Sequence, residues 1–509
     1  MSGVRNPTME SLPVEILIQT FSHFCFHCQH PGHFPNADTY EARNDKRFLA
    51  SLCRTSRTIC TVAQPILYHY YATGNSRVET KLYRGHDEVN KHRREPDYLP
   101  QFVCSISQRP DLAAQVTTMH VVLGDVLSGY ENQAQIIESL FELSVTKKLL
   151  PRYRMRENWL DGRFSEWREY ERKELHLWLA TLAMVLTPRL ANLLLAIDHN
   201  AAFWTLEDSP HLKLPSLHTL GLVGHALDYH FSELEALYAA LPNLQTIYAC
   251  DAAGRSQNVA KALYSGYEYK LALSNVKKLA VSDLIPDHLG KLLPCVPQLE
   301  DLGYYWDGTE EFGVADFVEL LAPVKTTLKR LCIEFLPGSS EDILSDPFPT
   351  WIDPPRVNYA PVRTLRQFDN LEDLVISCYL IYREHDRDKS DRLIALLPKS
   401  IRKLRISYLY KGMEQSLRQL AAVAPNEFPL LKEIAIGVAE RTDPRYDYSI
   451  DRTTALGGLF EAAGIRFSFK RDFLGPDPRT IIPGAMADSR LIPVPRVMDA
   501  MTDFELEGE

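Results

Sequence analysis

A six-residue pattern of apolar and polar positions recurs along most of the chain. Positions one, four and six of each segment are apolar, and positions two and three are usually polar. Ten segments fit this frame: residues 116–121, 190–195, 217–222, 244–249, 276–281, 299–304, 328–333, 371–376, 401–406 and 431–436. Because side chains alternate between the two faces of a strand, each segment predicts a short strand with one buried face.

The segments between these strands have a different periodicity. Apolar side chains recur every three or four residues in five of them: residues 230–242, 286–294, 314–323, 392–398 and 413–425. This spacing predicts helices, and a proline near the end of most of them marks where the helix is expected to stop. Residues 457–464 predict one more helix, which closes the last repeat.

Strand and helix thus alternate with a period near 30 residues. From Leu190 to Leu431 successive strands begin 23 to 43 residues apart. A unit of this size cannot bury its own apolar face, so neighbouring units must stack. We therefore expect an α/β fold over residues 100–470, a curved leucine-rich-repeat solenoid with parallel strands inside and helices outside. The alternative is an ordinary α/β domain whose strands fall into frame by chance.

Two regions do not follow the repeat. Residues 125–188 interrupt it with an apolar helix and then a charged aromatic stretch containing Trp159, Trp167 and Trp178. They predict a pair of helices, either a solvated insertion or a flap that binds a partner. Residues 471–509 are rich in proline, lack periodicity and end in acidic residues, so we expect an extended or disordered tail.

Residues 10–71 have a helical pattern of their own. Pro13 suits a first helical turn, where a missing N–H is tolerated. The buried stripe of the first helix is expected to contain Val14, Leu17, Phe21 and Phe24. Ile16 and Ile18 do not belong to this stripe. The helix therefore has more apolar surface than a lone helical unit of this size can cover.

The motifs of this region resemble the F-box family. They are Leu-Pro-x-Glu-Ile-Leu at residues 12–17, Leu-Cys-x-x-Ser-Arg at 52–57 and Pro-x-Leu-Tyr at 65–68. The resemblance implies a three-helix module that docks on the Skp-type adaptor of cullin–RING ubiquitin ligases. The adaptor-binding residues it implies are Leu12, Pro13, Glu15, Ile16, Leu52, Ser56, Leu67 and Tyr68. One departure is the link between the first two helices, residues 25–46, which is longer than usual.

The F-box-like segment followed by degenerate repeats is similar to the leucine-rich-repeat F-box proteins of fungi. This similarity implies a substrate receptor that joins the adaptor, and through it the cullin and RING subunits, to an unknown protein substrate. A non-degradative F-box scaffold is the alternative. The strand register predicts the substrate-binding residues on the concave face: Tyr248, Tyr305, Arg330, Glu334, Lys403 and Arg405. We do not expect an enzyme, because in the ligases that the chain resembles the RING subunit and its conjugating enzyme supply the transfer chemistry.

One short segment has the composition of a metal site. Residues 25–33 contain the candidate ligands Cys25, Cys28, His30 and His33. Thiolate and imidazole are the ligands that structural zinc prefers, but such sites usually join distant segments, whereas these residues lie within nine positions. We therefore favour a histidine-rich loop that lengthens the F-box-like module, leave zinc as the minor alternative, and expect no cofactor.

Composition narrows the class of protein further. The chain has 509 residues and a formal net charge of −10, which argues against a nucleic-acid binder. There is no apolar run long enough to cross a membrane and no continuous apolar segment at the start, so we expect neither a membrane span nor a secretory signal. Nine scattered cysteines indicate reduced thiols in the cytoplasm or nucleus.

Overall fold

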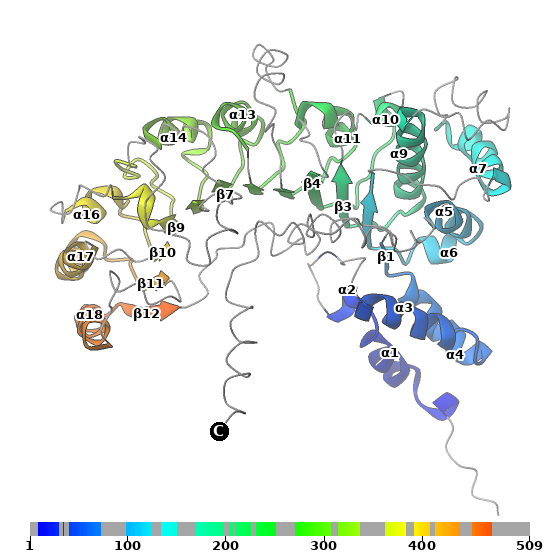
Figure 1. Cartoon of the computed structure of the whole chain (residues 1–509), viewed down its shortest axis with the longest axis horizontal. Helices are drawn as coiled ribbons and strands as arrows, with labels where there is room; N and C mark the ends of the chain where they lie inside the picture. Colours follow the sequence, from blue (N-terminus) through cyan, green and yellow to red (C-terminus); the bar gives the residue numbers. More distant parts are fainter. Residues whose placement is uncertain are drawn as a thin grey trace, which may run out of the picture. The chain divides into compact units, whose positions relative to one another are not determined.

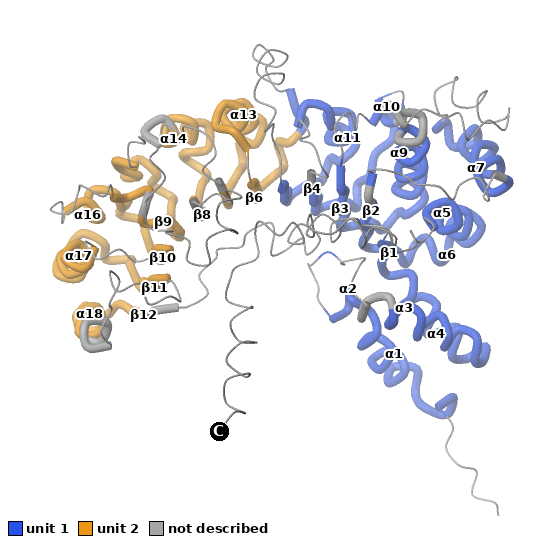
Figure 2. Tube along the Cα trace, in the orientation of Figure 1, with its two compact units in different colours: residues 1–261, 270–272, 479–489 blue, residues 262–269, 273–478, 490–509 orange. Residues whose placement is uncertain are grey.

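The computed structural model describes the N-terminal helices and most of the repeats. The described residues are 9–29, 34, 40–72, 98–123, 134–149, 169–197, 203–207, 209–224, 231–250, 270–282, 284–306, 314–335, 362–382, 391–407, 413–437 and 450–470. The chain forms two compact units (Figure 2). Unit 1 comprises residues 1–261, 270–272 and 479–489, and unit 2 comprises residues 262–269, 273–478 and 490–509. The expected tail, residues 471–509, lies outside the described residues.

Unit 1 begins with a helical segment. Its elements are η1 (Met9–Ser11), α1 (Val14–Ser22), α2 (Phe26–Gln29), α3 (Tyr40–Leu52) and α4 (Arg57–Leu67). Pro13 precedes α1 with φ −52°. Ser56 caps α4, because its hydroxyl accepts a hydrogen bond from the Ile59 N–H at 3.2 Å. The three expected helices are α1, α3 and α4, and the short helix α2 lies in the long link between the first two.

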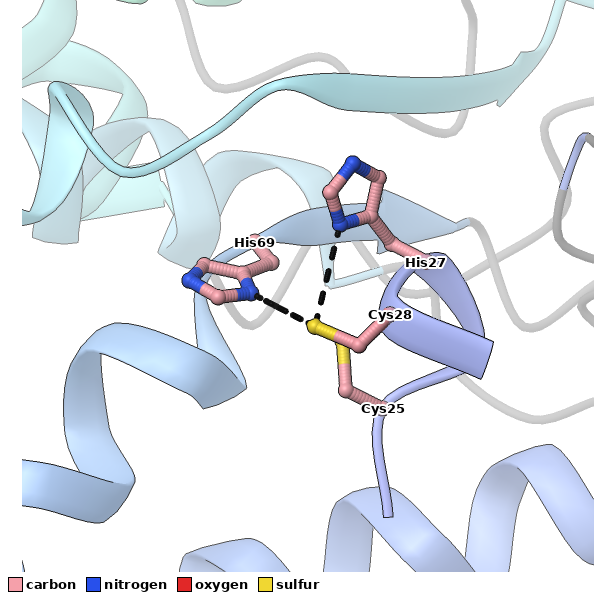
Figure 3. A group of neighbouring side chains, drawn as sticks. All are labelled: Cys25, His27, Cys28 and His69. Atoms are coloured by element: carbon pink, nitrogen blue, oxygen red, sulfur yellow. Dashed lines mark hydrogen bonds between the residues drawn. The ribbon is translucent and has the colours of Figure 1, made fainter. Parts of the chain in front are cut away.

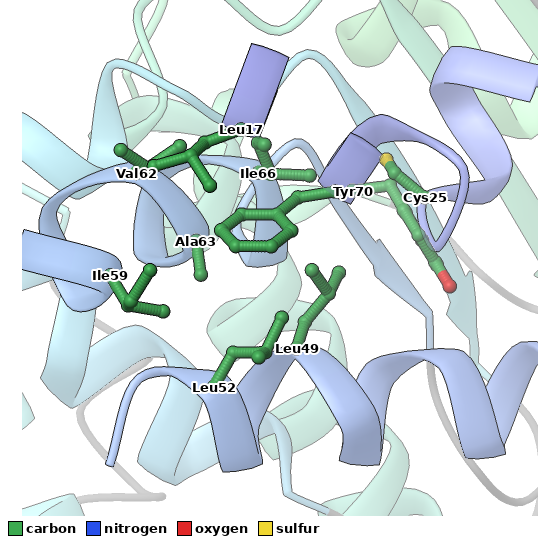
Figure 4. Close-up of a cluster of buried hydrophobic side chains, with 10 residues drawn as sticks. Leu17, Cys25, Leu49, Leu52, Ile59, Val62, Ala63, Ile66 and Tyr70 are labelled. Carbon is green, nitrogen blue, oxygen red and sulfur yellow. The ribbon is translucent and has the colours of Figure 1, made fainter. Parts of the chain in front are cut away.

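An apolar core holds this helical segment together (Figure 4). Its buried members are Leu17, Phe21, Cys25, Leu49, Leu52, Ile59, Val62, Ala63, Ile66 and Tyr70. Burying each large side chain contributes roughly 1.5–3 kcal/mol. Two residues of the expected stripe are not among these buried members: Phe24 is half-buried and packs against the core, and Val14 is 51% exposed. The first helix packs against α4 through Leu17 and Phe21, which leaves its first turn uncovered.

The remainder of unit 1 alternates strands and helices. Its strands are β1 (Tyr70–Ala72), β2 (Thr118–Val122), β3 (Asn192–Ile197), β4 (Thr219–Gly224) and β5 (Thr246–Cys250), each parallel to the next. Between them lie α5 (Leu99–Gln108), α6 (Pro110–Ala113), α7 (Ala134–Lys147), α9 (Glu169–Leu186), α10 (Trp204–Glu207), η6 (Phe231–Leu234) and α11 (Glu235–Ala239). Figure 1 shows α9 and α11 on the same side of β3 and β4.

Unit 2 continues the same alternation. Its strands are β6 (Lys278–Ser282), β7 (Asp301–Trp306), β8 (Arg330–Phe335), β9 (Asp373–Ser377), β10 (Lys403–Ser407), β11 (Glu433–Gly437) and β12 (Arg466–Lys470), each parallel to the next. Its helical elements are α13 (Pro286–Leu292), η7 (Leu293–Cys295), α14 (Val314–Leu320), η8 (Ala322–Val324), η9 (Cys378–Leu380), α16 (Arg392–Leu396), α17 (Met413–Glu427) and α18 (Ile450–Ala462).

The strand register follows the six-residue frame. Position four of one segment pairs with position four of the next, as Leu302 pairs with Leu331, and position six does the same, as Tyr304 pairs with Ile333. These four side chains are buried. The expected α/β fold with parallel strands is thereby confirmed, and the twelve described strands follow the order of the sequence. Two of them, β1 and β12, were not predicted.

The helices also lie where the apolar spacing placed them, with two differences. The helix expected at residues 457–464 is α18, which begins earlier, at Ile450. The other difference is at a proline. Helix α17 does not stop at Pro425 but runs to Glu427. The Phe428 N–H donates to the Ala424 carbonyl at 2.9 Å, so the hydrogen-bond ladder resumes after the proline. Pro425 therefore removes one N–H from the ladder of α17 without ending the helix.

The two expected helices of the interrupting region are α7 and α9. Trp178 of α9 is fully buried, and its indole N–H donates to the Leu149 carbonyl at 2.9 Å. Its ring stacks on Phe141 of α7, with ring centroids 4.7 Å apart. The apolar half of α9 is therefore part of the core of unit 1, while Trp159 and Trp167 lie outside the described residues. Over the described part of the chain, every helix is too short or too polar to span a membrane.

Candidate functional site

The first helix leaves a group of large apolar side chains uncovered. We call these side chains the apolar surface of α1; they are Val14, Ile16 and Ile18 of the helix and Met9 and Leu12 just before it. Leu12 is 44% exposed and Ile16 is 45% exposed, and the other three are exposed to a similar degree. Exposed apolar side chains that form a patch indicate an interaction site. Val14 and Ile18 are four residues apart and share one face of α1, whereas Ile16 lies on the opposite face.

Two further residues of the F-box-like pattern lie at the same surface. Pro13 and Glu15 are exposed, next to Leu12 and Ile16 in the sequence. Glu15 is in the first turn of α1, where a carboxylate interacts favourably with the positive end of the helix dipole. Four of the eight expected adaptor-binding residues are therefore exposed and close in sequence, and so are Val14 and Ile18, which were not among the eight. The exposure of Ile18 could have been predicted from its sequence position, because it does not belong to the buried stripe.

The other four expected adaptor-binding residues have different surroundings. Leu52 is only 8% exposed and belongs to the core, so little of its side chain is available to a partner. Helix α3 turns Leu52 toward the core that it shares with α4, which the motif alone does not show. Ser56 is half-buried and its hydroxyl caps α4. Leu67 and Tyr68 are half-buried, and the Tyr68 ring stacks on Phe102 with centroids 6.4 Å apart.

The residues expected to bind substrate divide into a buried and a charged group. The buried ones are Tyr248, Tyr305 and Glu334, at 8%, 1% and 1% exposure, so their expected presentation to a partner is wrong. Tyr305 has a local cause: a Cβ built on Gly303 would lie 2.9 Å from Cε2 of its ring. The ring therefore lies back over the glycine of its own strand, and Glu334 is its neighbour on β8.

Two of the three charged residues, Arg330 and Lys403, belong to a ladder that crosses the strands of unit 2, and the third, Arg405, pairs with a member of it. Adjacent strands place these residues side by side in the order Lys278, Asp301, Arg330, Asp373, Lys403, Glu433 and Arg466. The charges alternate in sign along this charged ladder. Like charges opposite one another would destabilise a sheet, and alternating charges stabilise it.

Several members of the charged ladder form ion pairs. Arg330 Nη2 lies 2.9 Å from Asp301 Oδ2, and Lys278 Nζ lies 3.8 Å from the same oxygen. Arg405 Nη2 lies 3.5 Å from Asp373 Oδ2. Burial raises the pKa of Asp301 and of Asp373, and the neighbouring cations oppose that rise. Arg330 and Arg405 are therefore already engaged by carboxylates, while Lys403 is exposed.

A cysteine–histidine cluster lies at the end of the first helix (Figure 3). It consists of Cys25, His27, Cys28 and His69, whose sulfur and nitrogen atoms all lie within 4.8 Å of one another. Cys28 Sγ is 3.3 Å from His69 Nδ1 and 3.9 Å from His27 Nδ1. Cys25 Sγ is 3.9 Å from His69 Nδ1. Hydrogen bonds from the Cys25 thiol and the two histidines lower the pKa of Cys28, whereas the Cys25–Cys28 hydrogen bond and burial raise the pKa of Cys25.

The cluster differs from the metal-ligand set expected from the sequence. Cys25 and Cys28 do lie together, but His30 and His33 fall outside the described residues. His69 takes part instead, from the junction between α4 and β1. Sequence reasoning missed it because nothing in the order of residues places His69 next to a motif so far upstream.

Neither the protein-family models nor the curated proteins match this chain. Functional conclusions therefore come from its own residues and their geometry.

Proposed function

We propose that this protein is the substrate-receptor subunit of an SCF (Skp–cullin–F-box) ubiquitin ligase. The observation that supports this most directly is the apolar surface of α1. Leu12, Pro13 and Ile16 of the F-box-like motif are exposed, while Leu17 and Phe21 hold the helix to its core. The motif thus combines a buried half that fixes the fold with an exposed half that is available to an adaptor.

The exposed part of these side chains limits how much apolar burial can contribute. Fully burying a large apolar side chain contributes roughly 1.5–3 kcal/mol, and these five are already about half covered, so together they offer a gross gain of about 5 kcal/mol. Association costs at least ~4 kcal/mol in lost translational and rotational freedom. The gain is close to this cost, so specific binding also requires polar contacts, such as those of Glu15. Because affinity is concentrated in a few residues, Leu12 and Ile16 are the strongest candidates.

The repeats would supply the second half of the function. A long parallel array offers an extended surface on which a protein substrate can be held. Holding a substrate lysine near the conjugating enzyme raises its effective concentration, and no chemistry by this chain is required. In this proposal the RING subunit and the conjugating enzyme carry out the transfer.

Reconstituted ubiquitin transfer tests the proposal. The purified chain would be combined with a Skp-type adaptor, cullin, RING subunit and conjugating enzyme, together with proteins captured on the chain. We expect at least one captured protein to be ubiquitinated only when the chain is present. The Leu12→Ala/Pro13→Ala variant should lose this activity, and Leu459→Ala, which truncates a leucine of 40% exposure on α18, should keep it.

The outcomes separate the two F-box functions. Adaptor binding without ubiquitination of any captured protein would replace the receptor by a non-degradative scaffold. Full activity of the Leu12→Ala/Pro13→Ala variant, or transfer without adaptor and cullin, would contradict the proposal.

A further inference from the structure

We infer that the cysteine–histidine cluster is a structural zinc site, with two thiolate and two imidazole ligands. The inference does not depend on the ligase function, because it concerns only the side chains of the cluster and the segments that they join. It differs from the sequence expectation in its histidines, since His27 and His69 replace the pair in the following loop.

The distances within the cluster suit a tetrahedral ion. Zinc binds sulfur at about 2.3 Å and nitrogen at about 2.0–2.1 Å, so neighbouring ligand atoms in a tetrahedron lie roughly 3.3–3.8 Å apart. The sulfur–nitrogen separations of 3.3 Å and 3.9 Å fall at or near this spacing, and all ligand atoms of the cluster lie within 4.8 Å of one another. Small side-chain rotations close the difference. Figure 3 shows the Nδ1 atoms of both histidines directed at the Cys28 sulfur.

The origin of the ligands removes the main objection to zinc. Structural sites join segments that are distant in the chain, and a Cys-x-x-Cys turn usually supplies one half of the site. Cys25 and Cys28 form such a turn, while His69 comes from beyond α3 and α4. Without a metal ion, two thiols and two imidazoles would share a partly buried space. Only weak hydrogen bonds would connect them, because a thiol is a weak donor and a weak acceptor.

The backbone contacts of His69 indicate which segments a zinc ion would connect. The His69 carbonyl accepts hydrogen bonds from the Thr117 and Thr118 N–H groups at 3.0 and 3.3 Å, and from the Thr117 hydroxyl at 3.0 Å. His69 is therefore fixed to the start of β2 through its backbone. A zinc ion on its ring would tie α2 to this same point, and so would link the N-terminal helices to the first strands of unit 1.

Metal analysis of the full chain, purified without a polyhistidine tag, tests the inference. We expect about one zinc ion per chain by mass spectrometry. Cobalt exchanged into the site should give the thiolate charge-transfer and d–d absorption bands of a tetrahedral site. The Cys28→Ser and His69→Ala variants should lose the ion. Zinc affinity should fall by more than the roughly 10–100-fold that removal of a supporting partner costs.

Matched variants distinguish this cluster from its neighbours. Cys104→Ser removes a half-buried thiol of α5, and His23→Ala removes an exposed imidazole just after α1, so both should keep the ion. The His30→Ala/His33→Ala variant should also keep it. Loss of zinc in that variant, or retention in His69→Ala, would overturn the ligand assignment.

The unaltered chain provides a test that does not rely on the folding of any variant. In the zinc-bound protein Cys25 and Cys28 should resist alkylation and become reactive after chelation, as peptide mapping would show. A folded chain that binds no zinc or cobalt, or one in which these two cysteines form a disulfide while zinc is available, would overturn the inference.

Discussion

Leu12 and Leu52 belong to the same family pattern, but they have opposite surroundings. Leu12 is 44% exposed on the apolar surface of α1, whereas Leu52 is 8% exposed inside the helical core. Removing methyl groups from a packed core costs the transfer free energy and also leaves a cavity. Removing them from an exposed side chain costs neither. The two leucines should therefore be separable by experiment.

Leu52→Ala should lower the free energy of unfolding of the helical segment by about 2–4 kcal/mol. Leu12→Ala should change it by less than about 0.5 kcal/mol, because surface substitutions away from special features have small effects. Denaturant unfolding followed by circular dichroism measures both values. Equal losses in the two variants would show that Leu12 is packed rather than exposed.

Gly221 shows the same dependence on surroundings in unit 1. A Cβ at this position would lie 2.8 Å from Leu194 Cδ1 and 2.9 Å from Phe34 Cε2. Both neighbours are fully or almost fully buried. A larger residue on β4 therefore collides with a ring that comes from the link between α2 and α3. The matched control is Gly458 of α18, where an added Cβ meets nothing within 4 Å.

Gly221→Ala should destabilise the chain by about 1–3 kcal/mol through overpacking. Gly458→Ala should stabilise it by about 0.5–1 kcal/mol, since alanine is the better residue inside a helix. Thermal unfolding should show shifts of opposite sign. If Gly221→Ala left the stability unchanged, Phe34 would not be packed against β4.

Among the elements, the strands of unit 2 are connected by the charged ladder. Asp301 is the carboxylate that Lys278 and Arg330 share, and its side chain is only 12% exposed. Its folded-state pKa is raised because burial disfavours the charged form, and Lys278 and Arg330 oppose this. A carboxyl whose folded pKa exceeds its unfolded value binds its proton more tightly when folded. Its contribution to stability is therefore present at low pH and is lost as the pH rises through the folded pKa.

Arg330→Met removes one of the opposing cations. Since Arg330 is more than half exposed, the loss at pH 7 should be only about 1 kcal/mol after solvent screening. The loss should shrink at a pH below the pKa of Asp301, where the protonated carboxyl needs no cation. Unfolding at several pH values measures it. The control is Lys329→Met, which breaks an exposed pair with Glu300 and should have little effect on stability at any pH. If Arg330→Met lost the same stability at every pH, the role of Asp301 would be contradicted.

For the molecule as a whole, the repeat frame was predictable because strand alternation and stacking leave a period in the sequence. All ten expected strands are present, and each begins two residues into its segment. The two missed strands have weaker signals. Tyr70–Ala72 is only three residues long, and Arg466–Lys470 follows Gly464, a helix-ending residue at φ +75°, without the preceding apolar and polar frame.

The candidate sites were less predictable, for reasons that the same residues show. Strand alternation places Tyr305 on a face but does not show that its ring lies over Gly303. The glycine two residues earlier on the same face was the available signal. His69 could not be found at all, because its contact with Cys28 depends on how α3 and α4 fold back. Leu12 and Ile16 were predictable because they lie off the buried stripe.

The most direct test of the account is calorimetric titration of a purified Skp-type adaptor into the full chain. We predict one-to-one binding with a negative heat-capacity change, the mark of buried apolar surface. Leu12→Ala/Ile16→Ala should weaken it at least ~10-fold, since ~1.4 kcal/mol corresponds to a factor of ten. Leu459→Ala should bind like the unaltered chain. Absence of adaptor binding by the unaltered folded chain, or undiminished affinity of Leu12→Ala/Ile16→Ala, would contradict the account.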